Sequence, residues 1–305
     1  MNLVITKTKP RASDFMTLNG PLSFGLIILQ WILIAGLIAA SLWLDHWLVY
    51  LVAVWGIGSR MVALAEVIGH ESVHNNLFRK KRLNRDLEFL WFLPIFETYD
   101  SYREAHETHH RDLMQSNDPT YQDYVRWGLL KDDVNYFWAW FVRPFLFFDT
   151  PHMLRTIFHG LRTDAAYRQR LLGFWIPAAT LIAVTGTGEY FFWYWVVPLL
   201  WAYPALIFWS EVGEHYRTPR GATRNTFGLL EWLLISPHND RYHAVHHQFP
   251  RIPWFNLGRA HRALFRKNEQ GDRPYAISES RGFLDLYRQI QNREVAMVSP
   301  PAASA

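Results

Sequence analysis

From Trp47 to His74 the chain reads WLVYLVAVWGIGSRMVALAEVIGHESVH. The run up to Gly69 has the length of a helix that crosses a bilayer, which needs about 20 apolar residues. It ends in His70 and His74, and residues four apart lie on the same face of a helix. The stretch therefore predicts a membrane-spanning helix that presents two imidazoles at its end.

Two further histidine clusters share the spacing H-x-x-H-H, and one isolated histidine accompanies them. The clusters are His106-Glu-Thr-His109-His110 and His243-Ala-Val-His246-His247, and the isolated residue is His215 in Glu-Val-Gly-Glu-His. Neutral imidazole is a common ligand of zinc, copper and non-haem iron. Nine of the 14 histidines are therefore predicted metal ligands: His70, His74, His106, His109, His110, His215, His243, His246 and His247.

Four segments are predicted to cross the membrane, namely residues 24–44, 47–69, 171–184 and 190–209. Short turns at residues 45–46 and 185–189 join them into two helical hairpins. Lys and Arg are absent between residues 14 and 59 and between 171 and 216, and they gather in the flanking polar regions. Because positive residues favour the cytoplasmic side, both termini and all nine histidines are expected there.

These patterns predict an all-α integral membrane protein with a helical cytosolic cap that holds a histidine-rich di-metal site. The expected organisation is a cytosolic segment at 1–23, a membrane domain at 24–264 and a cytosolic segment at 265–305 with a disordered tail. Two shorter apolar runs, residues 87–96 and 136–148, are interrupted by prolines and are not expected to span. They suit either the headgroup region of the bilayer or the core of the cytosolic part.

The amino-acid composition excludes some kinds of site and partner. The chain has no cysteine, which excludes disulfides and thiolate metal sites. Its net charge of +4 follows the membrane pattern, so we expect no nucleic-acid partner. The basic run at residues 79–85 is expected to contact lipid phosphates, or alternatively to dock an acidic electron-transfer protein. Residues 1–15 show no secretory signal peptide.

The first cluster also matches the zinc metalloprotease motif H-E-x-x-H, in which Glu71 would be the general base. A catalytic zinc ion takes three protein ligands and keeps one position open. Nine histidines are too many for one such ion and suit two ions that share them. The two-ion site is therefore the favoured interpretation. A membrane protease is kept as an alternative, as is a metal transporter, which would instead need ligands along a path through the membrane.

Several other polar residues lie near the clusters or within the spans. Glu211 is expected to share the metal site or to hydrogen-bond a ligating imidazole, and Asn239 is a candidate for the same role. Arg60, inside the second span, is expected to pair with a carboxylate such as Glu66 or to reach other polar groups. The remaining histidines, which lack cluster spacing, are expected to be structural: His46, His152, His159, His238 and His261.

The three clusters, in this order and between two membrane hairpins, resemble those of the membrane fatty acid desaturase and hydroxylase superfamily. The stretch from His243 to Leu257 is similar to that family's third histidine box and its continuation. Glu214-His215-Tyr216 and Asn117-Asp118-Pro119 also resemble elements of family members. The resemblance covers residues 24–264.

The resemblance implies a non-haem di-iron centre with two iron ions, held by the nine histidines, that uses O₂ and external electrons to remove hydrogen from a long apolar chain. A fatty acid or lipid desaturase is the function it favours, and a hydroxylase or ketolase of a carotenoid or similar molecule is the alternative. Because no cytochrome b5 domain is fused to the chain, a separate donor is expected, of the ferredoxin, rubredoxin or cytochrome b5 type. His243 stands where front-end desaturases have Gln, and Glu211 where some desaturases have Asn.

Overall fold

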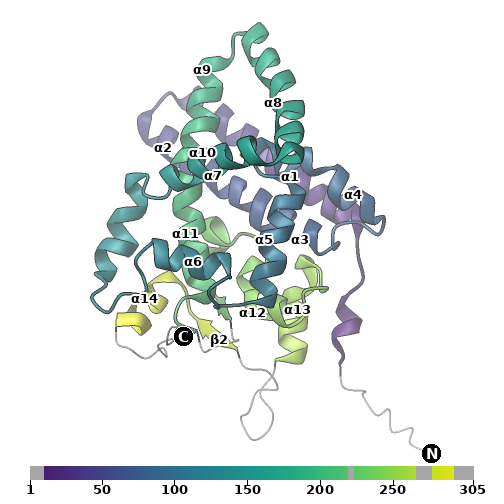
Figure 1. Cartoon of the computed structure of the whole chain (residues 1–305), viewed down its shortest axis with the longest axis vertical. Helices are drawn as coiled ribbons and strands as arrows, with labels where there is room; N and C mark the ends of the chain where they lie inside the picture. Colours follow the sequence, from purple (N-terminus) through teal and green to yellow (C-terminus); the bar gives the residue numbers. More distant parts are fainter. Residues whose placement is uncertain (1–9, 219–222, 266–276, 292–305) are drawn as a thin grey trace, which may run out of the picture.

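The computed structural model describes residues 10–218, 223–265 and 277–291. Within them the chain is almost entirely helical, and Figure 1 shows how the helices are arranged. The predicted disordered tail lies outside the described residues.

Three helices are long and apolar enough to cross a membrane: Gly20–Leu44, Trp47–Val73 and Gly188–His215. The first is α1, and the second joins α2 (Trp47–Val62), a π-helical turn η2 (Ala63–Gly69) and α3 (His70–Val73). The third joins α9 (Gly188–Phe191), η7 (Phe192–Val196), α10 (Val197–Leu200) and α11 (Ala202–His215). These helices correspond to the first, second and fourth predicted spans, so the prediction of a helical, membrane-type protein is confirmed.

The third predicted span lies in α8 (Ala165–Thr185), which is not among the three long apolar helices. Its apolar part begins only after Arg170, and 14 residues of helix rise roughly 21 Å, short of the roughly 30 Å of a bilayer core. Figure 1 shows that α8 and α9 form a hairpin at one end of the molecule. Gly186 closes this hairpin in the left-handed conformation, with φ of 68°. The number of four spans stays a prediction.

The hairpin of α1 and α2 turns where the sequence predicts it. Asp45 adopts the left-handed conformation with φ of 41°, and the Nδ1 atom of His46 accepts the N–H of Leu48 to cap α2. The outer face of α1 exposes apolar side chains such as Phe24 and Ile32, while Gln30 is buried against α2. A helix with an apolar exposed face and a polar buried group is typical of a membrane protein.

The remaining helices of the described residues, apart from α8, pack around the membrane helices and are together called the cap. The cap is built from η1 (Ala12–Phe15), α4 (Lys81–Asp86), η3 (Glu88–Leu90), η4 (Leu93–Ile95), α5 (Tyr99–Arg111), α6 (Pro119–Arg126), η5 (Trp138–Val142), η6 (Arg143–Leu146), α7 (Thr150–Thr163), η8 (Glu231–Ile235), η9 (Asp240–Tyr242), α12 (His243–Gln248), α13 (Trp254–Leu264) and α14 (Phe283–Gln291). Two short parallel strands, β1 (Arg224–Thr226) and β2 (Ser278–Ser280), pair beside α12 with Arg224 opposite Ser278.

The two shorter apolar runs do not form long helices, as predicted. Residues 136–148 contain only the short helices η5 and η6, which pack on the membrane helices: the ring of Phe145 lies 5.2 Å from that of Trp55. Phe137, Leu146 and Phe147 are exposed. Exposed apolar side chains that continue the surface of the membrane helices favour the headgroup placement for this run.

Strand β1 connects the end of α11 to α12. The buried guanidinium of Arg224 donates hydrogen bonds to the carbonyl oxygens of Gly213 and Tyr216 at 3.0 and 2.9 Å. The side-chain oxygen of Asn225 accepts the N–H of Ala244 at 2.9 Å. The end of α11, which carries His215, and the third cluster on α12 are thereby fixed relative to each other.

Candidate metal centre

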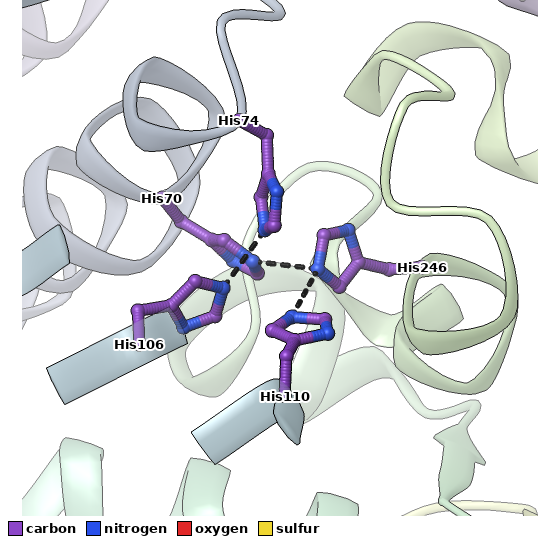
Figure 2. A group of neighbouring side chains, drawn as sticks. All are labelled: His70, His74, His106, His110 and His246. Carbon is purple, nitrogen blue, oxygen red and sulfur yellow. Dashed lines mark hydrogen bonds between the residues drawn. The ribbon is translucent and has the colours of Figure 1, made fainter. Parts of the chain in front are cut away.

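The structure brings all nine clustered histidines together in two neighbouring groups. Within each group, one ring nitrogen of every member lies within 4.8 Å of those of the others. The first group, drawn in Figure 2, consists of His70, His74, His106, His110 and His246. The second group consists of His109, His215, His243 and His247.

Helical periodicity explains this division. Residues four apart lie on one face, so the pairs His70 and His74, His106 and His110, and His243 and His247 each enter a single group. The middle histidine of each H-x-x-H-H cluster points to the other group. Helices α5 and α12 therefore lie between the two groups and contribute to both, which is why this spacing suits two ions that share a ligand cluster.

The ring nitrogens converge at distances that fit ligands of a common ion. Two nitrogens bound to one ion at about 2.0–2.1 Å lie roughly 2.9–3.4 Å apart in octahedral or tetrahedral geometry. The Nε2–Nε2 distances are 2.8 Å for His70–His246, 2.8 Å for His74–His106, 3.1 Å for His110–His246, 2.9 Å for His215–His243 and 3.2 Å for His109–His247.

The outer ring nitrogens show which way the imidazoles are protonated. His70 Nδ1 lies 3.1 Å from the backbone oxygen of Glu66, and His109 Nδ1 lies 2.8 Å from Oδ1 of Asp118. An oxygen without a proton only accepts, so each Nδ1 carries the hydrogen and each Nε2 has a free lone pair. A free lone pair directed into a group of imidazoles is available to a metal ion.

Asp118 orients His109, a member of the second group. It is fully buried, and its carboxylate accepts three N–H groups: His109 Nδ1, and the backbone amides of Thr120 at 3.0 Å and Met114 at 2.7 Å. In the sequence, residues 117–119 resemble an element of family members, without a role for Asp118. A buried Asp that precedes a proline and begins a helix close after a histidine cluster is the signal that identifies its role.

Electrostatics keep the imidazoles neutral, which is the form that binds metals. Burial lowers the pKa of His74 to about 4, and burial together with the neighbouring His74 and His109 lowers the pKa of His110 to about 3. Burial and the neighbouring imidazoles hold the pKa of His246 well below its usual range. The group therefore needs no deprotonation to take up an ion at neutral pH.

A third buried set lies beside the second group and contains two carboxylates. Glu214 and Asp240 are close to His243, and Glu214 Oε2 lies 3.5 Å from His243 Nδ1. Ser210 also donates to Glu214 at 3.1 Å. A carboxylate next to the outer nitrogen orients the imidazole and increases its basicity.

Glu71 does not take the position that a protease base requires. Its Oε2 atom accepts the backbone N–H of Trp254, the first residue of α13, at 3.0 Å. Nearby, the side chain of Asn76 donates to the carbonyl oxygen of Pro250 at 2.8 Å. The first cluster is thereby attached to the segment that follows the third cluster, and Glu71 has a structural role that the protease alternative leaves unexplained.

Replacing Glu71 by Gln distinguishes these roles. The amide oxygen of Gln accepts the same N–H, so we expect retained metal content and catalytic activity, with a loss of about 0.5–1.5 kcal/mol in the free energy of unfolding. Metal analysis, product analysis and thermal unfolding of the purified variant check this. Abolished catalysis in a variant that still binds metal would show that Glu71 is a catalytic base.

The other predicted polar residues have partners outside the two groups. The Glu211 carboxylate accepts the hydroxyl of Thr120 at 3.0 Å, and Asn239 donates to the carbonyl oxygen of Trp254 at 3.0 Å. Thr120 is held by Asp118, so Glu211 reaches the second group only through these two residues. A direct role of Glu211 or Asn239 at a metal ion stays a prediction.

Arg60 contacts polar groups rather than Glu66. It donates to the side chains of Gln30 at 3.2 Å and Ser59 at 2.7 Å, and to the carbonyl oxygen of Leu233 at 3.0 Å. Glu66 instead accepts the hydroxyl of Tyr102 at 2.6 Å.

The histidines without cluster spacing lie outside both groups. His46 caps α2, His238 lies 3.1 Å from Gln30, His152 lies 3.5 Å from Thr156, and His261 Nε2 lies 3.0 Å from Oε1 of Glu279.

Two adjacent histidine groups on a helical fold with long apolar helices are consistent with a metal site in a membrane-type enzyme. The family model described as "Fatty acid desaturase" matches residues 41–278. The chain belongs to the fatty acid desaturase family and is an oxidoreductase of that family.

Curated relatives are similar to the chain over most of its length. Dihydrorhizobitoxine desaturase of Bradyrhizobium elkanii is 24% identical over 259 residues, which cover 74% of this chain and 70% of the relative. An sn-1 acyl-lipid omega-3 desaturase (ferredoxin) of Nostoc sp. (strain 36) is 25% identical over 279 residues, covering 78% and 76%. An sn-1 oleoyl-lipid 12-desaturase of Arthrospira platensis is 25% identical over 226 residues, covering 66% and 64%.

Proposed function

We propose that the chain is a membrane-bound, non-haem di-iron desaturase that uses O₂ to introduce a double bond into a lipid or other long apolar chain. The observation that carries the proposal is the division of nine histidines into two adjacent groups of five and four. The names of the relatives, all desaturases, support desaturation over hydroxylation or ketolation.

The donor set supports iron. All members of both groups are imidazoles, and the chain has no cysteine that would favour a thiolate centre. Bound iron would supply O₂ activation and the removal of hydrogen from an unactivated C–H bond, a reaction that side chains alone do not perform. The balanced reaction takes –CH₂–CH₂–, O₂, two electrons and two protons to –CH=CH– and two waters.

The nine histidines would hold the two ions, and neighbouring oxygen atoms orient two of the rings. The backbone oxygen of Glu66 and the carboxylate of Asp118 fix the rings of His70 and His109, so that their Nε2 atoms would face bound ions without rearrangement. Neutral imidazole ligands would leave the ions strongly positive.

We further propose the complete topology predicted from the sequence, with four spans in two hairpins and with the metal centre and both termini on the cytoplasmic side. The absence of basic residues from the two hairpin turns supports this orientation. The proposed domain is residues 24–264, between terminal cytosolic segments at 1–23 and 265–305. This arrangement lets a substrate enter from the bilayer while electrons arrive from the aqueous side.

A separate protein is proposed to supply the electrons, and ferredoxin is favoured because the name of one relative includes it. The exposed basic residues Arg79, Lys80 and Lys81 lie on the cap, just before and at the start of α4. Arg82 and Arg85 pair with Asp86 and Asp100 at 2.6 Å each. The first three thus offer positive charge to lipid phosphates or to an acidic donor.

Mass analysis of the product tests the reaction type. When the protein is expressed with a ferredoxin and its reductase, we expect lipids that have lost two hydrogens per reaction. A gain of one oxygen atom would instead show that the chain is a hydroxylase or ketolase. Cells that express a variant with His70 and His74 both replaced by Ala are the matched control, because the same lipids and donor are present.

A further inference from the structure

A pocket of about 490 Å³ opens between α5, α6, α7 and α11. Its size is typical of a pocket that binds a small molecule. One part of its wall is apolar and includes Ile95, Met153, Ile157 and Ile207, while another part carries carboxylates. A wall of mixed character is suited to an amphiphilic molecule.

The pocket reaches the metal centre at Glu66. This residue lies one helical turn before His70, and its backbone oxygen holds the ring of His70. The hydroxyl of Tyr102 binds the Glu66 carboxylate, and the ring of Tyr102 stacks on that of His106 with 5.7 Å between centroids. Glu66 also lines a small void that is bounded by His70 and His246. Glu66 thus separates the pocket from the first histidine group.

Most charges in the pocket are already neutralised or hydrogen-bonded. Arg126 forms ion pairs with Asp123 and Asp149. Asp164 accepts the backbone amides of Ala166 and Tyr167 at 2.8 and 3.1 Å, as the cap of α8.

Glu97 is different. Its Oε1 atom accepts the backbone N–H of Thr98 at 2.7 Å, and Ser101 also contacts it, but no Lys, Arg or His among the described residues forms an ion pair with it. Burial raises the pKa of the Glu97 carboxyl to about 7, which shows that this site disfavours a carboxylate without a counter-charge. A cation placed in the pocket would remove this cost.

We propose that this pocket holds the polar end of the substrate, and that this end carries a protonated amine that pairs with Glu97. The inference rests on the proposed function, since it assigns the pocket to the substrate of the histidine centre. Because Glu66 separates the pocket from His70 by only one helical turn, the oxidised C–H bonds lie near the amine end rather than far along an acyl chain. The favoured substrate class is an amphiphile with a primary amine.

A binding experiment with matched probes tests this. The full-length, iron-loaded protein is placed in nanodiscs of zwitterionic phosphatidylcholine, so that the bilayer itself does not attract cations. A primary amine, an alcohol and a carboxylic acid on the same saturated alkyl chain are then titrated, with empty nanodiscs as the reference. We expect the amine to bind at least about tenfold more tightly than the alcohol, since a charge-assisted hydrogen bond replaces a neutral one.

Two variants complete the experiment. Glu97→Gln still accepts the N–H of Thr98 but has no charge, so the amine preference should fall to about the level of the alcohol while binding of the alcohol is unchanged. Asp86→Asn removes an exposed carboxylate at the end of α4, which does not line the pocket, and should keep the preference for the amine. Equal binding of amine and alcohol by the unaltered protein, tighter binding of the acid, or an unchanged preference in Glu97→Gln would overturn the proposal.

Iron content and product formation are measured on the same preparations. Missing iron or missing product would contradict the proposed function, but binding of the probes does not need turnover. A failure of the pocket assignment is therefore distinguishable from a failure of the enzyme assignment.

Discussion

Replacing His246 by Ala is expected to abolish product formation and to remove one of the two metal ions. The Nε2 atom of His246 lies 2.8 Å from that of His70 and 3.1 Å from that of His110, so it occupies a central position in the first group. Loss of residues that merely orient metal ligands costs roughly 10–100-fold in affinity or activity, and loss of a ligand exceeds this range. We expect activity to fall by more than about 100-fold.

The metal content of this variant is as informative as its activity. The second group contains His109, His215, His243 and His247 and is unaltered, so about one ion should remain per chain. His46→Ala is the matched control, because His46 caps α2 in the outer turn at the opposite end of that helix from His70. A His246→Ala protein with normal activity and two ions would show that the first group is not a metal site.

Asp118→Asn is expected to have the second largest effect, although Asp118 is not a predicted ligand. Its carboxylate accepts three N–H groups, whereas the Asn side chain has one acceptor oxygen and an NH₂ group that would face one of these donors. Even with its amide oxygen toward His109, a neutral Asn holds the Nδ1–H form of this ring less firmly than a carboxylate does. We expect a 10–100-fold lower metal affinity of the second group, with activity reduced to match.

Competitive chelation followed by metal analysis measures this change, and thermal unfolding of the metal-loaded protein monitors the fold. Asp133→Asn, which alters an exposed carboxylate nearby in the sequence, is the control. Unchanged affinity in Asp118→Asn would mean that the ring of His109 is oriented by the surrounding packing alone.

The local patterns of the sequence predicted the parts of the structure that depend on local chemistry. Helical periodicity and apolar length are properties of short stretches, so the three long helices and the shared face of His70 and His74 followed directly. The turn at Asp45 and His46 followed from the break between two apolar runs.

Features that depend on contacts between distant segments were less accessible. His70 meets His246 across 176 positions, and no local pattern specifies which histidines share an ion. The same holds for Arg60: the sequence left a carboxylate such as Glu66 and other polar groups as alternative partners, and the structure shows the polar groups. The sequence showed Asp118 only as part of a motif that resembles family members, because its role depends on where His109 lies after folding.

The number of membrane spans did not follow from helical and apolar character alone. Residues 171–184 are apolar and helical, but the basic residues just before them shorten the apolar length below that of the three long helices. The pocket that carries Glu97 was also hidden, since its walls come from four helices that are far apart in the chain.

Metal analysis of the unaltered, purified protein tests the two-ion centre most directly. With the nine imidazoles in two groups, the protein should contain about two iron ions per chain, and chelation should abolish product formation until iron is restored. A preparation that is fully active with a single zinc ion per chain would contradict the di-iron assignment.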